Sequence, residues 1–371
     1  MARNSIASAK RIVIKIGSSS LTGNAGSALD PAAVEKIVAI VAAAKSRGAE
    51  VLVVSSGAIA AGLAPLGLSA RPKDLATQQA AASVGQGLLI HRYTESFAKR
   101  SITASQVLIT TEDIVRRVHY QNVQRTLFKL LQLGVVPIIN ENDSVGTQEI
   151  RFGDNDRLAA LVALLIDADL LVLVSDIDAL YDIDPSQAGA KAISEVTDFA
   201  DIAAIEVGGA GSAGVGSGGM VTKIEAARIA TGAGISMLLT SLEQAAQSIA
   251  GAELGTYFHG HERKTTSRLL WLAHAATPQG KLILDAGAVK AICERGTSLL
   301  PAGVTAVEGT FIAGDTVELV GPDAKVIARG LVAFDAVELP VMLGRSTKEL
   351  AAALGPEYER ELVHRDDLVL L

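Results

Sequence analysis

Residues 11–20 are RIVIKIGSSS, a largely apolar run that ends in a glycine and three serines. The run Arg11–Ile16 has the length and the β-branched content of a buried strand. Residues 51–62, VLVVSSGAIAAG, repeat the arrangement, since a second strand, Val51–Val54, is followed by a second loop of small residues. Strands that are apolar on both faces are typical of a parallel sheet covered by helices.

The segment between these two strands predicts a helix. Asp30 offers a capping side chain, and Pro31 suits the first helical turn. Apolar side chains recur at helical spacing from Val34 to Val41, and Gly48 stands where a left-handed C-terminal cap is expected. A strand, a helix and a second strand imply a right-handed crossover between parallel neighbours.

The same alternation continues to about residue 250. Further helices are expected near 74–99, 112–133, 156–166 and 220–232, and further strands near 102–109, 135–139, 170–174 and 235–239. This order predicts the α/β class, with an open, mostly parallel sheet sandwiched between helices.

The pattern changes near residues 277–280, TPQG. Short β-like segments separated by glycine turns follow at 281–284, 306–308, 316–320, 326–328 and 331–334. We therefore expect an α/β domain over 1–262, a linker over 263–277 and a small, mostly-β domain over 278–371.

Composition narrows the class of protein. At 371 residues the chain has room for about two domains, and its single cysteine, Cys293, excludes an internal disulfide and a cysteine-based zinc site. The N-terminal segment lacks the apolar stretch of a signal peptide, and no run approaches ~20 apolar residues, so we expect a cytoplasmic protein. The net charge of −7 disfavours nucleic-acid binding, which needs a basic surface.

In an open α/β sheet, ligands bind beyond the carboxyl ends of the strands. Loops of small or polar residues fall there at 15–20, 55–62, 140–143, 153–156 and 208–223. Each loop taken alone has an ordinary structural explanation, so their common position is what points to a ligand site.

The first three loops offer charge and backbone donors. Lys15 can place an ammonium beside phosphates cradled by backbone N–H groups, or it is a surface lysine on an edge strand. Ser55–Gly62 presents N–H groups at a helix start, or it is a tight packing turn. Asn140–Asp143 can bind the ammonium and carboxylate groups of an amino acid, or it is a simple turn.

The remaining loops are acidic and glycine-rich. Gly153–Asp156 lies at the start of a predicted helix, where acidic and amide side chains act as caps. One cap needs only one of these residues, so at least one other side chain is left to contact a ligand or the lysines. Gly208–Lys223 ends with a lysine in the first turn of a helix and suits the outer phosphates of ATP, the alternative being a linker. Ser175 and Asp176, at a strand end, can line the nucleotide side.

Other motifs bear on the function. Gly214–Gly219 matches the dinucleotide pattern G-x-G-x-x-G, but no convincing strand precedes it, so a nicotinamide dehydrogenase rests on that formal match alone. No Walker A sequence is present, so an ATP site here is not a P-loop. His259 and His261 lack a partner cluster of carboxylates, and we assign no metal to them.

The five loops together resemble those of the amino-acid kinase family. Within it, Ser56–Gly62 and Asn140–Asp143 resemble the members that phosphorylate the side-chain carboxylate of glutamate. Residues 278–371 resemble a PUA domain, including Gly296–Pro301 and His364–Asp367, so the likeness covers nearly the whole chain. It implies the amino-acid kinase fold and ATP-dependent formation of glutamyl 5-phosphate, the first step toward proline.

The resemblance also implies a role for each site residue. Lys15 and Lys223 would contact the transferring phosphoryl group, and Asp156 would hold both lysines. The glutamate pocket would consist of Ser56, Gly57, Asn140, Asp143 and Asn155. The ATP site would consist of Lys15, Ser175, Asp176, Ser217, Gly218, Gly219, Met220, Val221, Thr222 and Lys223. The family usually has threonine where Ser55 and Ser175 stand here, and both keep a hydroxyl.

The implied cofactors are ATP and Mg²⁺, with the metal held by the nucleotide phosphates and not by protein side chains. The implied partners are proline as a feedback inhibitor, further copies of the chain in a dimer or tetramer, and glutamyl phosphate reductase, with no membrane. RNA binding is the alternative that a PUA-like region offers. Residues 278–371, however, carry nine Lys or Arg against fourteen Asp or Glu, a net charge of −5 that a phosphate backbone would repel.

The chemistry fits this residue set. A glutamate carboxylate, with a pKa of about 4.3, is already ionised at neutral pH, so no general base is needed. The obstacle is that an anion must approach a polyanion, so catalysis reduces to positioning and charge neutralisation by Lys15, Lys223 and Mg²⁺. Acetylglutamate kinase, aspartokinase, UMP kinase and carbamate kinase are the alternatives within the family, and Ser56–Gly62 and the C-terminal domain argue against them.

Overall fold

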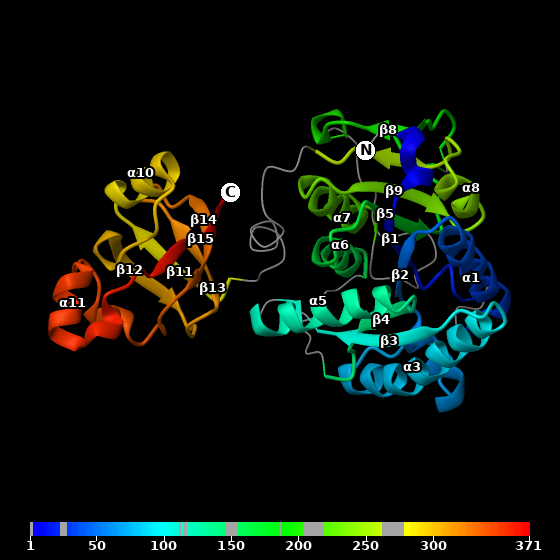
Figure 1. Ribbon diagram of the computed structural model, residues 1–371, viewed down its shortest axis with the longest axis horizontal. Coiled ribbons are helices and arrows are strands. Elements are labelled where there is room, and N and C mark those ends of the chain that lie inside the picture. The colour runs from blue at the N-terminus through cyan, green and yellow to red at the C-terminus, as the bar shows by residue number, and fades with distance from the viewer. Residues whose placement is uncertain are drawn as a thin grey trace. The chain divides into compact units, whose positions relative to one another are not determined.

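The computed structural model describes residues 3–22, 28–110, 113–114, 117–145, 155–185, 187–202, 219–261 and 278–371. The chain divides into two compact units (Figure 1). The larger unit contains the described residues among 3–114 and 119–261, and the smaller contains residues 117–118 and 278–371.

An eight-stranded sheet lies at the centre of the larger unit, in the order β3-β4-β2-β1-β5-β9-β10-β8. Neighbouring strands are parallel except for β9 and β10. Its strands are β1 (Arg11–Ile16), β2 (Glu50–Ser55), β3 (Ala104–Ile109), β4 (Val136–Glu141), β5 (Leu170–Ser175), β8 (Glu195–Val196), β9 (Ser236–Ser241) and β10 (Thr256–Phe258). A separate ladder pairs β6 (Leu180–Tyr181) with β7 (Ala192–Ile193). The chain places β2, β3 and β4 on one side of β1 before it adds β5 on the other, so β1 lies at a topological switch point.

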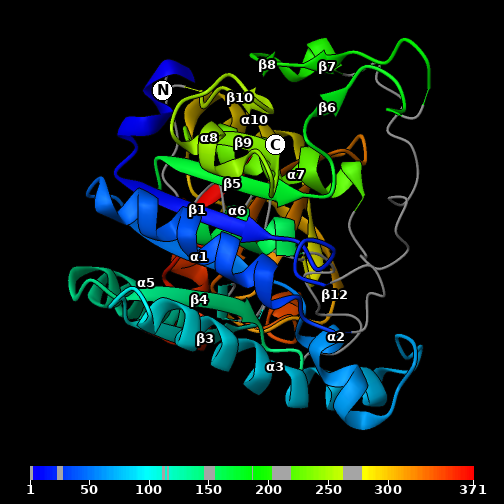
Figure 2. The same ribbon diagram turned by 90° about the vertical axis from the view of Figure 1, so that its right-hand side faces the viewer.

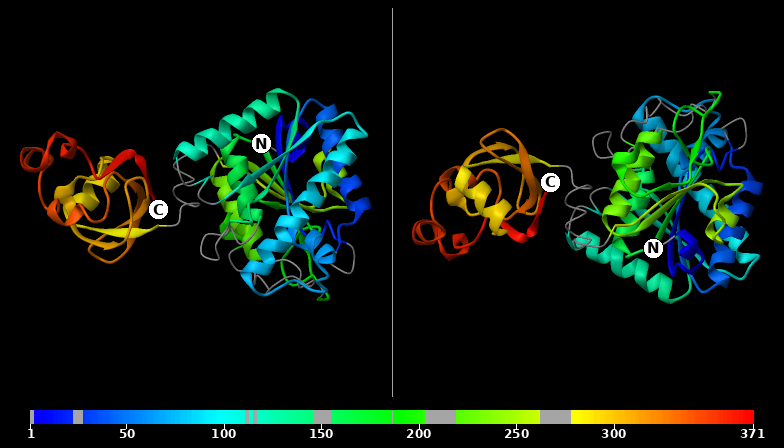
Figure 3. Two further views of the ribbon diagram at one scale, coloured as in Figure 1. Left: turned by 90° about the horizontal axis from the view of Figure 1, so that it is seen from below. Right: turned by 90° about the horizontal axis from the view of Figure 1, so that it is seen from above.

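Helices cover both faces of this sheet (Figure 1, Figure 3). One face carries α1 (Pro31–Ser46), α3 (Leu75–Ala98) and α8 (Ala245–Ile249), with α2 (Ala58–Leu63) against α3. The other carries α5 (Arg117–Gln132), α6 (Asn155–Leu165) and α7 (Met220–Gly232). Short 3₁₀ helices are η1 (Arg3–Ser8), η2 (Ala64–Leu66) and η3 (Phe199–Ile202). No helix in the described ranges combines the length and the apolar character needed to cross a bilayer.

The α/β prediction is confirmed, and each strand and helix expected in the larger unit is present within a few residues of its predicted bounds. At the start of α1, the Asp30 side chain accepts a hydrogen bond from the backbone N–H of Ala32 at 2.8 Å, and Pro31 is the first helical residue. After the helix, Gly48 has a φ of 88°, as expected of a residue in a left-handed cap.

One predicted boundary is wrong. The strand expected to end at Ile139 continues through Glu141, because Asn140 and Glu141 pair in parallel register with β3. Asn140 therefore lies within the sheet, 3% exposed, and not in the loop after it. A backbone ladder fixes this side chain more firmly than a loop would.

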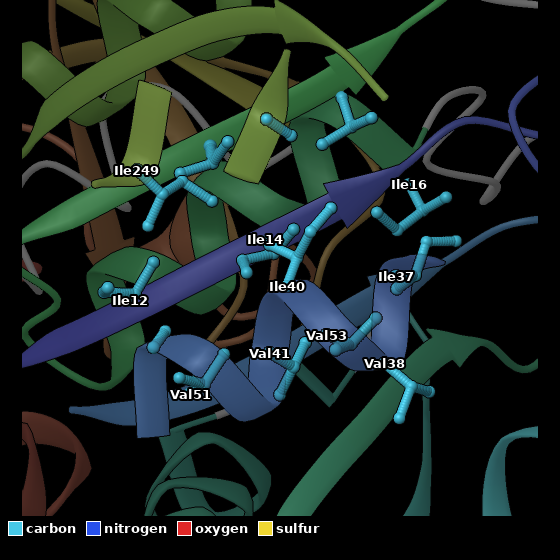
Figure 4. Close-up of a cluster of buried hydrophobic side chains, with 14 of the residues drawn as sticks. Ile12, Ile14, Ile16, Ile37, Val38, Ile40, Val41, Val51, Val53 and Ile249 are labelled. Carbon is cyan, nitrogen blue, oxygen red and sulfur yellow. The ribbon is translucent and has the colours of Figure 1, made fainter. Parts of the chain in front are cut away.

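Alternation along β1 sends its side chains to opposite faces of the sheet. Ile12, Ile14 and Ile16 belong to the buried cluster that lies against α1 (Figure 4). Val13 and Lys15 consequently point toward the opposite face, which α6 covers. The alternation of side chains along β1 thus places the ammonium of Lys15 on the side of the helix that begins with Asn155 and Asp156.

The smaller unit is a five-stranded sheet in the order β12-β11-β13-β14-β15, with helices beside it. Its elements are β11 (Gly280–Leu284), α10 (Ala286–Arg295), η4 (Pro301–Gly303), β12 (Val304–Gly309), β13 (Thr316–Val320), β14 (Val326–Val332), η5 (Leu339–Val341), α11 (Thr347–Leu354), η6 (Pro356–Tyr358) and β15 (Val363–Leu370). Two pieces expected at 326–328 and 331–334 form the single strand β14. Gly330 does not interrupt it, because its missing side chain makes room for Val363, whose Cγ1 would lie 2.3 Å from a Cβ there.

Glycines allow α2 and α3 to approach closely. A Cβ at Gly62 would lie 1.9 Å from the carbonyl oxygen of Ala81, and a Cβ at Gly85 would lie 1.8 Å from that of Ala58. We expect Gly85→Ala to destabilise the protein by about 3 kcal/mol, since backbone must move apart. Gly87→Ala is the matched control on the same helix; nothing lies within 4 Å of its Cβ, and it should stabilise by about 0.5–1 kcal/mol. Urea denaturation measures both, and equal stabilities would contradict the close contact.

Candidate active site

The carboxyl ends of β4, β2, β1 and β5, which are neighbours in the sheet, define one edge of the larger unit. Figure 2 shows β1 and β5 running in the same direction. The first residue after β1 and the first residue after β2 each donate a backbone hydrogen bond to a neighbouring strand. Gly17 N donates to Val174 O of β5 at 3.2 Å, and Ser56 N donates to Ile16 O of β1 at 3.1 Å. The ends of β5, β1 and β2 are therefore level, and their loops start side by side.

Lys15, Asp156 and Lys223 meet at this edge, although they come from β1, the start of α6 and the first turn of α7. Lys15 Nζ lies 2.5 Å from Asp156 Oδ1, and Lys223 Nζ lies 3.2 Å from Oδ2. Thr222 Oγ1 also donates to Oδ2, at 3.2 Å. The structure thus brings together, on one carboxylate, the two lysines that are 208 positions apart in the sequence, from 15 to 223.

This cluster is deeply buried and carries excess positive charge. Lys15 is 5% exposed, Lys223 7% and Asp156 0%. Burial by itself raises the pKa of the Asp156 carboxyl, but the charges of Lys15 and Lys223 outweigh it and hold that pKa below its usual 3.8. Two ammonium groups then share one carboxylate, which leaves a formal charge of about +1 where water screens it poorly. Such a centre suits a phosphoryl group.

A second group of side chains surrounds Asn155, the first residue of α6. Its Nδ2 donates to Ser55 O at 2.9 Å, to Ser56 Oγ at 3.0 Å and to Asn140 Oδ1 at 3.0 Å. One amide therefore joins the ends of β2 and β4 to the helix that carries Asp156. Three of the side chains expected in the acceptor pocket are in this hydrogen-bonded group: Ser56, Asn140 and Asn155.

The helix α3 supplies two polar contacts to the ends of β4 and β2 that sequence reasoning missed. Asn140 Nδ2 donates to Gln86 Oε1 at 2.7 Å. The Tyr93 hydroxyl lies 3.2 Å from Ser55 Oγ, and burial raises its pKa, so it remains protonated. Gln86 and Tyr93 stand seven residues apart, about two helical turns, on the face that also carries the buried Leu89. Polar residues at such positions are the signal that could have found them.

Two further pocket candidates occupy turns. Asp143 is half-buried within the turn 142–145 that follows β4. Gly57 precedes α2 with a φ of 94°, a conformation that a side chain would strain, so it has a structural reason to be glycine.

The nucleotide-side candidates lie at the ends of β5 and α7. Ser175 is buried and donates to Asp176, which is exposed, at 2.9 Å. Gly219 precedes α7, and Met220, Val221, Thr222 and Lys223 form its first turn. Ser217 and Gly218, like Gly153 and Asp154, lie outside the described residues.

Protein ligands for a metal do not gather in the part of the chain that the structure describes. No group of three or more His, Cys, Asp or Glu side chains there could hold a metal ion. His259 pairs with Glu195 at 2.7 Å, at the end of β10.

Comparison with known proteins identifies the family. The model of the amino acid kinase family matches residues 10–241, and that of the PUA domain matches residues 280–354. Glutamate 5-kinase of Streptomyces avermitilis is 61% identical over 371 residues, covering 100% of this chain and 99% of that protein. Glutamate 5-kinase of Streptomyces coelicolor is 60% identical over 370 residues, again covering 100% and 99%.

Among solved structures, carbamate kinase from Giardia lamblia bound to AMP-PNP superposes with a TM-score of 0.50 at 19% identity, over 69% of this chain and all of that one, a likeness of fold alone. The resemblance drawn from the loops is confirmed by the curated relatives. The family match includes β1, α6 and the first turn of α7, which hold the lysine cluster. The chain therefore belongs to the amino acid kinase family and has a PUA domain after its kinase region.

Proposed function

We propose that this protein transfers the γ-phosphoryl group of ATP to the side-chain carboxylate of glutamate, forming glutamyl 5-phosphate and ADP on the route to proline. The buried cluster of Lys15, Asp156 and Lys223 carries this proposal, because it concentrates positive charge at the ligand-binding edge of the sheet. The names of the full-length relatives support glutamate as the acceptor.

The transfer needs no proton to move. A carboxylate oxygen of glutamate attacks the γ-phosphorus, the bond from that phosphorus to the bridging oxygen breaks, and ADP leaves. The acceptor is already ionised at neutral pH, so the barrier is the repulsion between two anions. Lys15 and Lys223 lower it by neutralising the oxygens of the transferring group, while Asp156 keeps the two ammonium groups together.

The acceptor pocket is assigned to the group around Asn155 and the adjoining turns. Ser56 supplies a hydroxyl for a carboxylate, and Asn155 lies beside it and donates to Ser56 Oγ at 3.0 Å. Asn140 orients Asn155 through the 3.0 Å hydrogen bond. Asp143 offers the negative charge that the ammonium of an amino acid requires. Gly57 would line the same pocket.

The nucleotide is assigned to Ser175, Asp176 and the segment from Ser217 to Lys223. Mg²⁺ would enter with the nucleotide phosphates. We further propose that proline inhibits the protein, that the chain forms a dimer or tetramer, and that glutamyl phosphate reductase is a partner. We also propose that the chain consists of a kinase domain over 1–262, a linker over 263–277 and a PUA-like domain over 278–371.

Release of ADP tests the function. The full-length protein with ATP and Mg²⁺ should release ADP when glutamate is added, and far more slowly with acetylglutamate, aspartate or UMP. Added proline should slow the glutamate reaction. ADP release that does not depend on glutamate would remove the proposal, and preference for another acceptor would move the protein to another branch of the family.

A further inference from the structure

Gln86 lies on α3 and contacts Asn140, one of the residues assigned to the acceptor pocket. Its Oε1 accepts a hydrogen bond from Asn140 Nδ2 at 2.7 Å. Asn140 is itself buried within β4. The contact joins residues 54 positions apart, so it exists only because α3 lies along this edge of the sheet.

The hydrogen bonds determine which way each amide faces. A backbone N–H can only donate, so the atom of Asn140 that lies 2.9 Å from Glu141 N is the oxygen Oδ1. The same oxygen accepts from Asn155 Nδ2 at 3.0 Å. Asn140 Nδ2 must therefore face α3, where it needs an acceptor, and Gln86 Oε1 supplies it.

The nitrogen of the Gln86 amide indicates that the amide oxygen is the reason for a glutamine at this position. Gln86 Nε2 is buried, and within the described ranges it has no hydrogen-bond partner. An apolar side chain of similar length would fill the same space without burying an unpaired N–H group, which costs stability. Packing alone would therefore favour methionine or leucine over glutamine here.

We propose that Gln86 is a positioning residue for the acceptor pocket. It fixes the orientation of the Asn140 amide and, through Asn140, that of the Asn155 amide, which in turn holds the Ser56 hydroxyl. This inference rests on the proposed function, because it assumes that Asn140 and Asn155 line the glutamate site.

Gln86→Met tests the inference, because methionine keeps the length of the side chain and removes the acceptor oxygen. We expect the KM for glutamate to rise about tenfold, which is the loss of one well-placed hydrogen bond. The kcat and the KM for ATP should stay within about twofold, since the phosphoryl site is untouched. Leu88→Met is the matched control on the same helix; that side chain is 41% exposed, and the variant should behave as wild type.

A double-mutant cycle shows whether Gln86 acts through Asn140. In an Asn140→Ala background, Gln86→Met should cause no further loss of kcat/KM for glutamate, because the contact is already gone. An unchanged KM for glutamate, or losses that multiply in the double variant, would overturn the inference. Thermal unfolding is recorded for every variant, and Gln86→Leu takes the place of Gln86→Met if that variant does not fold.

The wild-type assay distinguishes failure of this inference from failure of the proposed function on which it rests. If the wild type releases no ADP with glutamate, the proposed function falls, and the inference falls with it. If the wild type is active and Gln86→Met matches it, only the role of Gln86 is lost.

Discussion

Lys223→Ala is expected to lower the kcat for glutamate phosphorylation by at least about 10²–10³-fold, the usual loss when one well-placed stabilising contact to a transition state is removed. The fold should survive, because Asp156 keeps Lys15 as its partner at 2.5 Å and the buried charges still balance. Initial rates of ADP release at saturating ATP and glutamate measure the loss, and circular dichroism checks the fold.

Lys36→Ala is the matched control for Lys223→Ala. The Lys36 side chain is 52% exposed and pairs with Glu243 at 2.7 Å on the surface, so its replacement should cost less than about 1 kcal/mol and leave turnover unchanged. Near-normal turnover by Lys223→Ala would remove Lys223 from the mechanism. A loss of similar size in Lys36→Ala would show that the effect is not specific to the cluster.

Asp156→Asn is expected to lose activity by a similar or larger factor and, in addition, to lose stability. Asparagine has nearly the same shape but no charge, so two buried ammonium groups would face each other without a counter-charge. Removing one partner of a buried ion pair typically costs about 3–5 kcal/mol. Urea unfolding of Asp156→Asn beside Lys223→Ala distinguishes the roles, because only the former should be strongly destabilised. Wild-type stability in Asp156→Asn would contradict the view that this carboxylate holds the lysines.

The same pair of proteins, wild type and Asp156→Asn, should differ in their response to acid. The pKa of Asp156 is lowered in the folded protein, so its ionised form stabilises the fold at every pH above the ordinary value of 3.8. This contribution is lost as the pH falls from 3.8 through the lowered value. The difference in unfolding free energy between the two proteins should therefore be constant from neutral pH to about 5 and shrink in stronger acid. A difference that is already shrinking near pH 6 would contradict the lowered pKa.

Local features of the sequence were enough to predict the strands and helices of the larger unit. The apolar run of β1, the capping pair Asp30–Pro31 and the glycine after α1 act through neighbouring residues, so their meaning is the same in any fold. The predicted loop after β4 shows the limit of such signals. Asn140 is polar and follows an apolar run, yet pairing with β3 keeps it in the strand.

The sequence by itself determined the α/β layering, the strand that carries Lys15 and the helix that carries Lys223, because periodicity and capping are short-range properties. The tertiary structure alone decided that both ammonium groups meet one carboxylate, and that Gln86 and Tyr93 of α3 contact the ends of β4 and β2. These contacts depend on strand order, register and the close approach of helices. Such features arise from residues far apart in the chain, so no local pattern contains them.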